Sequence, residues 1–189
     1  MDCKSKSDSE LIELIIECHK PAFDELYIRY SRKLVNFLYR MLNKDYEKAQ
    51  DFLHDVFLKI IENPKSYKPE KSSFSTWIYT IAYNKCKNEY KKESIRRNYN
   101  ENELMNSKNS FTEIKGNIDN HLFGECLEKE LRQLDEKHRA IFVLRYNDEL
   151  PIKEIAEIMD IPEGTVKSRL FYVTQKLASR LKEFNPHSG

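Results

Sequence analysis

The chain has 189 residues, of which 40% are hydrophobic and 33% are charged, and its net charge is +1. This composition is typical of a folded globular protein with one ordinary domain or two small ones, and it excludes a disordered chain. With four glycines and few alternating β-branched runs, the sequence favours an all-α fold. No apolar run reaches the length of a membrane span, and the opening MDCKSKSDSE lacks the apolar core of a secretory signal.

The cysteines and histidines are scattered along the chain without the spacing of a disulfide framework or a metal site. Cys18-His19 comes nearest to a ligand pair, and a core thiol beside a surface imidazole is the simpler interpretation. No glycine-rich phosphate loop and no nucleophile elbow occurs. We therefore expect no catalytic residues, no metal and no cofactor. The protein is expected in the reducing cytoplasm, without stable membrane insertion.

Three segments with helical spacing fill the first sixty residues or so. The first is Ser7–Cys18, and the second begins at Pro21 and ends where Asn43-Lys44-Asp45 breaks the pattern. The third, Ala49–Ile61, has one fully apolar face, and its other face carries Asp51, His54, Asp55 and Leu58. An acidic face with a leucine set into it suits the docking of a basic partner helix, although a solvated face is the commoner explanation of such a pattern.

A polar loop, NPKSYKPEKSS, leads into a helix over Phe74–Lys92 that mixes aromatic and basic residues. Its inward face is expected to hold Phe74, Trp77, Ile78, Ile81 and Ala82, and its exterior Tyr79, Tyr83, Asn84, Lys85, Lys87, Lys91 and Lys92. Single-stranded nucleic acids bind such mixtures, because each ring stacks on a base for about 1–3 kcal/mol while lysines follow the phosphates. The alternative is that Trp77 and several tyrosines are ordinary core residues.

The next segment loses the helical pattern and divides the chain. Ser94–Asn120 is rich in Asn, Ser and charge, which predicts a flexible linker over residues 95–121, with a helical turn near Glu101–Met105. Helical spacing resumes over Leu122–Leu134, and Asp135 is a candidate cap for the helix that follows. The sequence thus predicts two small helical domains, at residues 7–94 and 122–184.

Leu150–Leu177 has the pattern of a helix-turn-helix. Apolar residues recur at helical spacing before and after an interruption at Asp160–Gly164 that contains Pro162. The outer face of the second helix is expected to present Thr165, Lys167, Ser168, Arg169, Phe171 and Tyr172. Short polar residues followed by cations and aromatic rings suit a helix that enters the DNA major groove. A helical hairpin with a solvated basic face is the alternative.

These segments resemble the extracytoplasmic-function (ECF) group of the sigma-70 family of bacterial RNA polymerase sigma factors. AQDFLHDVFLKII is similar to the family's core-binding helix, and FSTWIYTIAYNKCKNEYKK to its promoter-melting helix. LDEKHRAIFVLRYNDELPIKEIAEIMDIPEGTVKSRL is similar to the family's C-terminal helix-turn-helix. One such motif alone has limited specificity, but three in this order, with a linker before the last, are specific.

The resemblance implies a protein without enzymatic activity that gives core RNA polymerase its promoter specificity. It implies docking on a coiled coil of the largest catalytic subunit through Asp51, His54, Asp55 and Leu58, a further contact with the flap region, and regulation by an anti-sigma factor. The loop Asn63–Ser73 would capture a base flipped out of the −10 element.

The resemblance also assigns two sets of DNA-binding residues. Recognition and melting of the −10 element would use Lys65, Tyr67, Lys68, Trp77, Tyr79, Tyr83, Asn84, Lys87 and Lys91. The −35 element would be read by Arg145, Thr165, Lys167, Ser168, Arg169, Phe171 and Tyr172.

Two other classes of protein remain as alternatives. A conventional helix-turn-helix regulator, with a ligand-binding or dimerisation domain at its N-terminus, would bind a palindromic site tightly as the free protein. The acidic docking face and the aromatic-basic helix argue against it. The sequence gives little support for an enzyme. It has many carboxylates, but no His or Cys residues are paired with them in the pattern of a catalytic site.

Overall fold

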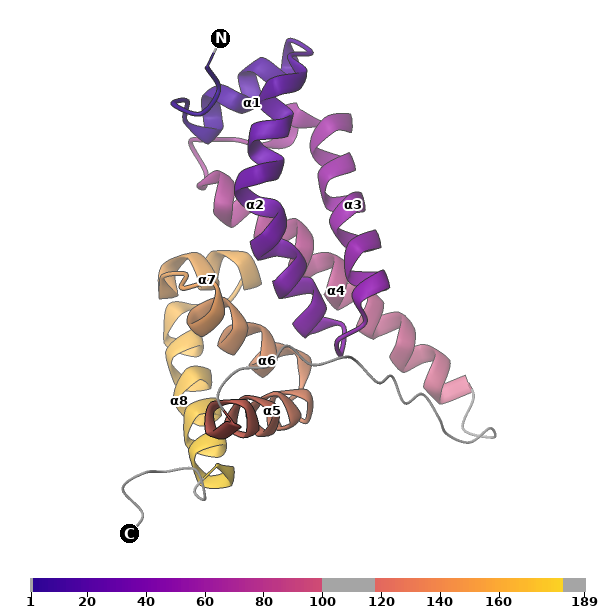
Figure 1. The fold of residues 1–189 in the computed structure, drawn as a ribbon, viewed down its shortest axis with the longest axis vertical. Helices are drawn as coiled ribbons and strands as arrows, with labels where there is room; N and C mark the ends of the chain where they lie inside the picture. Colours follow the sequence, from indigo (N-terminus) through magenta and orange to yellow (C-terminus); the bar gives the residue numbers. More distant parts are fainter. Residues whose placement is uncertain (1, 100–117, 182–189) are drawn as a thin grey trace.

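The structure is a computed structural model that describes the backbone of residues 2–99 and 118–181, and the side chains of residues 2–96 and 123–181. Its regular elements in these ranges are all helical, which confirms the predicted all-α class (Figure 1). The N-terminal part (residues 2–99) contains α1 (Asp8–Ile16), α2 (Lys20–Met41), α3 (Tyr46–Glu62), the 3₁₀ turn η1 (Pro64–Ser66) and α4 (Phe74–Tyr99). The C-terminal part (residues 118–181) contains α5 (Ile118–Arg132), α6 (Glu136–Phe142), the π-helical turn η2 (Val143–Asn147), α7 (Ile152–Met159) and α8 (Glu163–Arg180).

Local sequence signals set several of the helix ends. Ser7 forms a capping box with Glu10 at the start of α1. Asp45 and Asp135 accept backbone N–H groups at the starts of α3 and α6, as short polar caps do. The break between α2 and α3 is sharp because Asn43 and the next residue, Lys44, both adopt the left-handed region, with φ of 57° and 69°.

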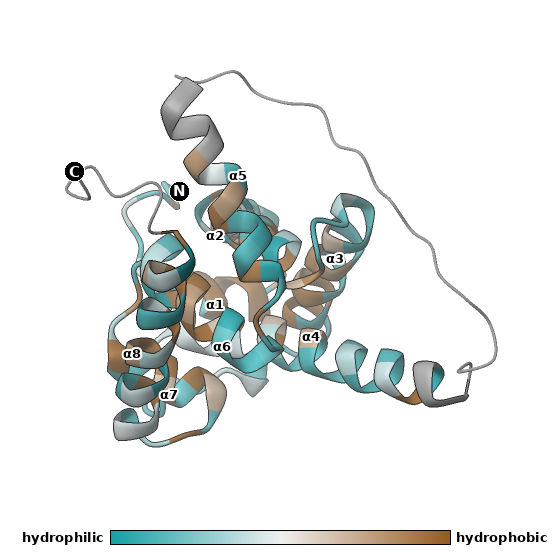
Figure 2. Cartoon of the chain, turned by 90° about the horizontal axis from the view of Figure 1, so that it is seen from below, coloured by the Kyte–Doolittle hydropathy of each residue, from teal (hydrophilic) through white to brown (hydrophobic). Residues whose placement is uncertain are grey.

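The core of the N-terminal part forms where the apolar faces of α2, α3 and α4 meet. Leu34 and Phe37 of α2, Val56 and Ile60 of α3 and Ile78 of α4 are fully buried. Figure 2 shows these apolar faces turned inward, with hydrophilic residues outside. α1 packs across the far end of α2, where Leu11 joins the same core.

Three expected boundaries are wrong by a few residues. α4 continues from the expected end, Lys92, to Tyr99, because ESIRRNY contains neither Gly nor Pro to stop it. α5 begins at Ile118, before the expected Leu122. α8 begins at Glu163, so Gly164 belongs to the helix and not to the turn. Most of the predicted linker, including the turn near Glu101–Met105, lies outside the described residues.

The two parts pack against each other. α7 lies beside α2 and α4 in Figure 1, and the contact between α4 and α7 is among the most extensive between any two helices described. One hydrophobic cluster therefore runs from α1 through α4 into α6, α7 and the start of α8. A second, smaller cluster of Leu131, Leu134, Val173 and Leu177 joins α5 to α8. The domain interface is thus continuous with the N-terminal core.

Candidate nucleic-acid interface

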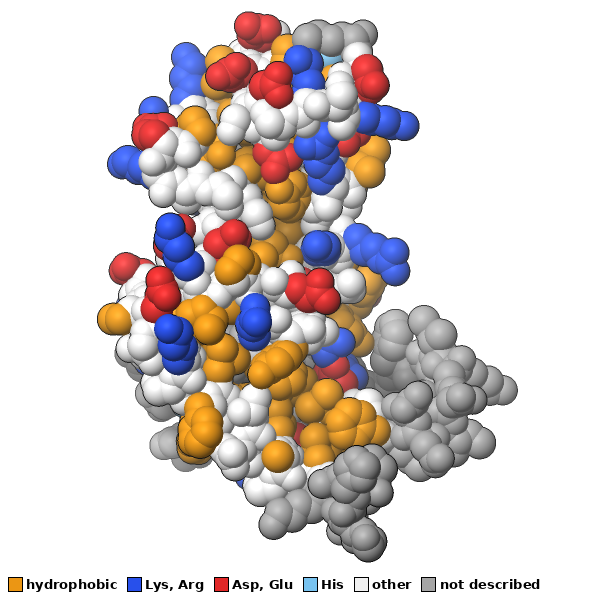
Figure 3. All heavy atoms as spheres, turned by 90° about the vertical axis from the view of Figure 1, so that its left-hand side faces the viewer, with side chains coloured by type: hydrophobic (Ala, Val, Ile, Leu, Met, Phe, Trp, Pro, Cys, Tyr) orange, Lys and Arg blue, Asp and Glu red, His pale blue; other side chains and the backbone are white. Residues whose placement is uncertain are grey.

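The second helix of the helix-turn-helix, α8, presents the predicted face to solvent. Its apolar stripe of Val166, Leu170, Val173 and Leu177 is buried. The outer face exposes Lys167, Ser168, Phe171 and Tyr172, with Thr165 and Arg169 half-buried. Phe171 is 67% and Tyr172 51% exposed, so this face offers two neighbouring aromatic rings to solvent. Figure 3 views the molecule from the side of α7 and α8 and shows cations interspersed with hydrophobic side chains there.

Neighbouring side chains hold this face in place. The ring of Tyr172 packs on His138 of α6 at 5.1 Å between centroids, and Lys176 Nζ lies 5.7 Å from the same ring. Ser168 Oγ donates to the carbonyl of Thr165 at 3.0 Å. Arg145 lies in the π-helical turn η2, where it is exposed and donates to Leu150 O at 3.0 Å. π-Helical turns within helices are frequent at functional sites.

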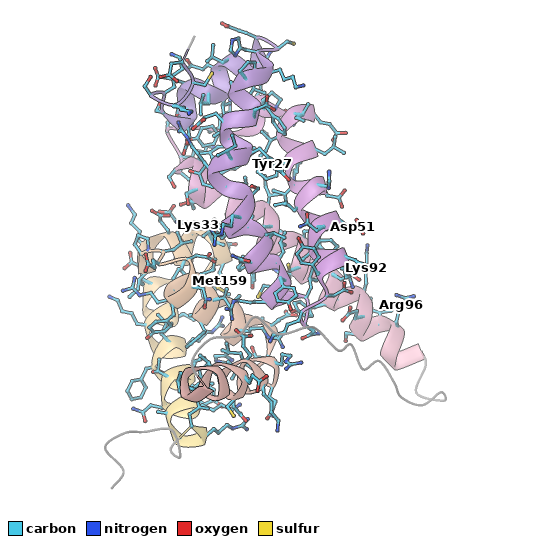
Figure 4. All side chains as sticks on the ribbon, viewed as in Figure 1. Tyr27, Lys33, Asp51, Lys92, Arg96 and Met159 are labelled. Atoms are coloured by element: carbon cyan, nitrogen blue, oxygen red, sulfur yellow. The ribbon has the colours of Figure 1, made fainter. Side chains whose placement is uncertain are left out.

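The predicted docking face on α3 is exposed. Asp51, His54, Asp55 and Leu58 all face solvent, and Leu58 is 50% exposed. Figure 4 shows Asp51 on the side of the molecule away from Met159 of α7. Asp55 is not a free charge, however, because it forms an ion pair with Lys85 of α4, whose ammonium lies 4.4 Å from the ring centroid of Phe52. The acidic character of the face rests more on Asp51 than the sequence predicts.

A groove of about 400 Å³ runs between α3 and α4. Two of the residues assigned to the −10 element, Trp77 and Asn84, line it. Its walls also include Asp55, Lys59, Thr80, Ile81, Lys85 and Asn88. Four lysines assigned to the same element, Lys65, Lys68, Lys87 and Lys91, are exposed. Further along, Figure 4 places Lys92 and Arg96 on the projecting end of α4, so the cationic character continues beyond the groove.

Three tyrosines assigned to the −10 element are buried, which corrects the expected exterior placement of Tyr79 and Tyr83. Tyr67, Tyr79 and Tyr83 are 6%, 1% and 5% exposed. Tyr67 packs against Phe74 and Trp77, with centroids 5.5 Å and 5.4 Å away. The ring of Tyr79 packs on Phe37 of α2 at 5.6 Å. The single inward face expected of α4 is therefore wrong, because α4 is buried on two sides.

The second side of α4 that faces the protein interior is a stripe of residues at helical spacing, which we call the tyrosine stripe: the buried Thr76, Tyr79 and Tyr83 and the half-buried Tyr90. Polar groups of the C-terminal part lie near its members. Thr76 Oγ1 donates to Glu154 Oε2 of α7 at 3.2 Å, and Tyr90 lies 3.4 Å from Arg139 Nη1 of α6. Burial raises the pKa of Tyr83 to about 12; Glu136 of α6 adds to the rise and Arg169 of α8 opposes it. Tyr79 approaches Asp148, which follows η2.

Arg139, only 5% exposed, links the two parts through neutral acceptors. Within the C-terminal part its guanidinium donates to the carbonyls of Leu131, Arg132 and Leu134 at 3.1, 2.8 and 3.1 Å. Across the interface it donates to Met41 O at 3.4 Å and Asn43 Oδ1 at 2.7 Å, at the end of α2. One side chain thus satisfies carbonyls at the C-terminal ends of two helices.

The sequence interpretation missed Arg139, Asp148 and the interface role of the tyrosine stripe. The spacing of Thr76, Tyr79, Tyr83 and Tyr90 could have indicated a second buried face. No local pattern marks Arg139 or Asp148, whose neighbours are set by the packing of the two parts.

Residues 2–99 and 118–181 contain no cluster of three His, Cys, Asp or Glu side chains suited to a metal ion. Over the same residues, no helix combines the length and apolar content needed to cross a membrane.

Comparison with known families matches both parts. The family described as Sigma-70 region 2 matches residues 26–95, and Sigma-70, region 4 matches residues 124–176. Among solved structures, the sigma factor RpoE of Bartonella quintana, in complex with the anti-sigma factor NepR, is similar at a TM-score of 0.71 with 21% identity over 85% of this chain and 96% of that one. CnrH, in complex with the cytosolic domain of CnrY, is similar at 0.69 with 18% identity over 94% and 99%. These likenesses show the same fold.

Curated relatives of nearly equal length identify the family. The ECF RNA polymerase sigma-E factor of Haemophilus influenzae is 30% identical over 93% of this chain and 96% of its own length. The ECF sigma factor SigW of Bacillus subtilis is 28% identical over 86% and 90%. Sigma factors have no catalytic activity of their own. The chain belongs to the ECF group of the sigma-70 family, whose members direct RNA polymerase to promoters.

Proposed function

We propose that this sigma factor binds core RNA polymerase through the exposed face of α3, melts the −10 element along α4, and reads the −35 element with α8. In this division the units are residues 7–94 and 122–184, joined by a linker at residues 95–121. The observation that carries the proposal is the separation of the surfaces. The outer face of α8 and the groove between α3 and α4 lie on different parts of the chain, with the docking face of α3 beside the groove.

The chemistry of each surface fits its role. The groove combines an indole, amides and two lysines, which suit unstacked bases and a phosphate backbone. The outer face of α8 combines cations, hydroxyls and two exposed rings, which suit base edges and phosphates in a major groove. Asp51 and the half-exposed Leu58 on α3 supply a charge and an apolar anchor for a partner coiled coil.

The partners proposed for this chain are the coiled coil of the largest catalytic subunit, the polymerase flap region, promoter DNA and an anti-sigma factor. Two proteins of similar fold were solved with the partners NepR, an anti-sigma factor, and CnrY, which supports the last of these. The site of action would be the cytoplasm, where bacterial polymerase transcribes.

The test is co-elution of the purified full-length protein with sigma-free bacterial core polymerase, compared with its binding to random-sequence duplex DNA. Binding to core with weak duplex affinity for the free protein supports the proposal. No core binding, together with a nanomolar specific duplex site, would replace it with the conventional regulator.

A further inference from the structure

The loop between α3 and α4 is anchored by one buried residue, Tyr67. This side chain is 6% exposed, whereas the residues directly before and after it face solvent. The Tyr67 N–H donates to Pro64 O at 3.3 Å, which closes the turn η1. A second turn follows at once, because the N–H of Lys71 donates to Lys68 O at 3.0 Å. Tyr67 therefore separates η1 from an exposed tip at residues 68–71.

Tyr67 belongs to a group of four aromatic side chains, which we call the loop cluster: Tyr30 of α2, Tyr67, and Phe74 and Trp77 in the first turn of α4. The ring of Tyr67 lies 5.4 Å from that of Trp77 and meets Phe74 edge-on at 5.5 Å. Tyr30 also meets Phe74 edge-on, at 5.1 Å. Edge-on and tilted pairs at roughly these distances are the favoured arrangement of aromatic rings. Because Trp77 lines the groove between α3 and α4, the loop cluster connects the loop to the groove wall.

Polar contacts fix the loop cluster to the two N-terminal helices. Ser9 Oγ of α1 lies 3.3 Å from the Tyr67 hydroxyl, at hydrogen-bond distance. Asp8 of the same helix accepts from the Tyr30 hydroxyl and, at 2.9 Å, from Arg29 Nη1 of α2. The Tyr67 hydroxyl thus has a partner inside the protein, as a buried tyrosine usually does, and its ring is out of reach of a base.

Trp77 is placed differently, at the surface of the groove. Its side chain is half-buried and shares the groove wall with the exposed Asn84. An indole that is free to rotate must be ordered when a base stacks on it, and this ordering weakens binding. Contacts with Tyr67 and Phe74 order the indole in advance.

We propose that Tyr67 is a positioning residue for the DNA strand and makes no contact with the strand itself. Its buried ring holds the indole of Trp77 at the groove wall for stacking on a base. It also fixes the start of the tip, whose exposed cations Lys68 and Lys71 lie ready for the phosphates. This inference deepens the proposed function of α4 and rests on it.

The chain has a single tryptophan, so intrinsic tryptophan fluorescence reports on Trp77 alone. Three full-length variants are compared with the wild type. Tyr67→Leu removes the ring, and Tyr67→Phe keeps the ring without its hydroxyl. Tyr27→Leu is the matched control, because it removes an aromatic contact with Phe57, at 4.7 Å, outside the loop cluster. The measurements are the emission spectrum of the free protein and its quenching by a random-sequence DNA single strand of about 20 nucleotides.

Tyr67→Leu is expected to shift the Trp77 emission to longer wavelength, because water replaces the neighbouring ring. It is also expected to weaken strand binding about 10-fold, which corresponds to part of one base–aromatic stack. Tyr67→Phe should restore the wild-type spectrum and stay within about 2-fold of the wild-type affinity, since the ring and not the hydroxyl packs on the indole. Tyr27→Leu should change neither quantity. Circular dichroism establishes that each variant is folded.

Two results would overturn the inference. One is a folded Tyr67→Leu variant with the spectrum or the strand affinity of the wild type. The other is a Tyr67→Phe variant that loses affinity while its spectrum is unchanged, because the hydroxyl would then contact the strand directly. This second result decides the question even if Tyr67→Leu does not fold.

Failure of the proposed function would be seen separately. Wild-type protein would then neither co-elute with core polymerase nor change its fluorescence when the strand is added. The spectral shift of Tyr67→Leu is measured without DNA, so it would still show whether Tyr67 holds the indole of Trp77.

Discussion

The carboxyl group of Asp148 lies against the phenol of Tyr79 in the buried contact between the two parts of the chain. Although close, Asp148 Oδ2 and the Tyr79 hydroxyl make no hydrogen bond of ordinary geometry to any described residue. Burial therefore dominates the titration of Asp148 and raises its pKa to about 6, while Tyr79 and the charges of Lys33 and Arg40 on α2 oppose the rise. This carboxyl group makes the packing of the two parts against each other depend on pH.

The packing of the two parts against each other is predicted to strengthen as the pH falls through about 6. When the two parts separate, Asp148 regains its ordinary pKa of 3.8, so the packed arrangement binds the proton more tightly. Packing is most favourable below the lower pKa, weakens as the pH rises between the two values, and is weakest above about 6. The difference amounts to up to about 3 kcal/mol. Scattering between pH ~5 and pH ~8 should show a larger mean radius at the higher pH.

Asp148→Asn is the control for this pH dependence. The amide stays neutral whether the two parts are packed or separated, so the variant should keep them packed at neutral pH and lose most of the pH dependence. A wild-type radius that is constant over this range, or an Asp148→Asn variant that still changes as strongly, would show that Asp148 does not control the packing.

Arg139→Lys is predicted to destabilise the protein by about 2–4 kcal/mol. A lysine has a single ammonium group where arginine has a planar guanidinium with several N–H donors. The carbonyls at the ends of α2 and α5 would therefore lose their buried hydrogen-bond donors. Urea unfolding followed by circular dichroism measures the change. Arg132→Lys, at an exposed position on the same side of the protein, should shift the free energy of unfolding by less than about 0.5 kcal/mol. Equal effects of the two substitutions would contradict a special role for Arg139.

Replacing Asp51 and Asp55 together by Lys is predicted to abolish co-elution with core polymerase, with a loss of affinity on the order of 100-fold or more. Both residues are exposed, and the ion pair of Asp55 with Lys85 is a surface pair worth at most about 1 kcal/mol, so the fold should survive. The control is the double replacement of Glu13 and Glu17, exposed acidic residues at α1, by Lys. Normal competition for core by the Asp51 and Asp55 variant would mean that the docking face lies elsewhere.

Lys167→Ala is predicted to weaken binding to −35 duplex DNA and to reduce the slope of log affinity against log salt by about one if the ammonium meets a phosphate. Fluorescence anisotropy over a salt series measures both quantities. Lys153→Ala, which removes an exposed cation from α7, is the matched control and should leave the slope nearly unchanged. A change in base preference without a change in slope would assign Lys167 to base readout.

The sequence alone determined the helices, the helix-turn-helix and the orientation of α3 and α8. These features depend on contacts within a few residues of one another: apolar spacing selects the buried face, and short polar residues such as Ser7, Asp45 and Asp135 cap the helices that follow. The exposed positions of Asp51 on α3 and Lys167 on α8 follow from the same periodicity. The helix ends were predicted less accurately. α4 was expected to end at Lys92, but no nearby residue stops the helix there, and it continues to Tyr99.

Only the tertiary structure decided what covers α4. A tyrosine can stack on a base or pack in a core equally well, so its pattern along a helix does not reveal its partner. Tyr79 is buried because Phe37 lies on one side and Asp148, far along the chain, approaches its hydroxyl. Arg139 likewise has no local signature, since its acceptors at Met41 and Asn43 become neighbours only when the two parts pack. Contacts between distant segments depend on the whole arrangement of helices, and local periodicity carries no information about them.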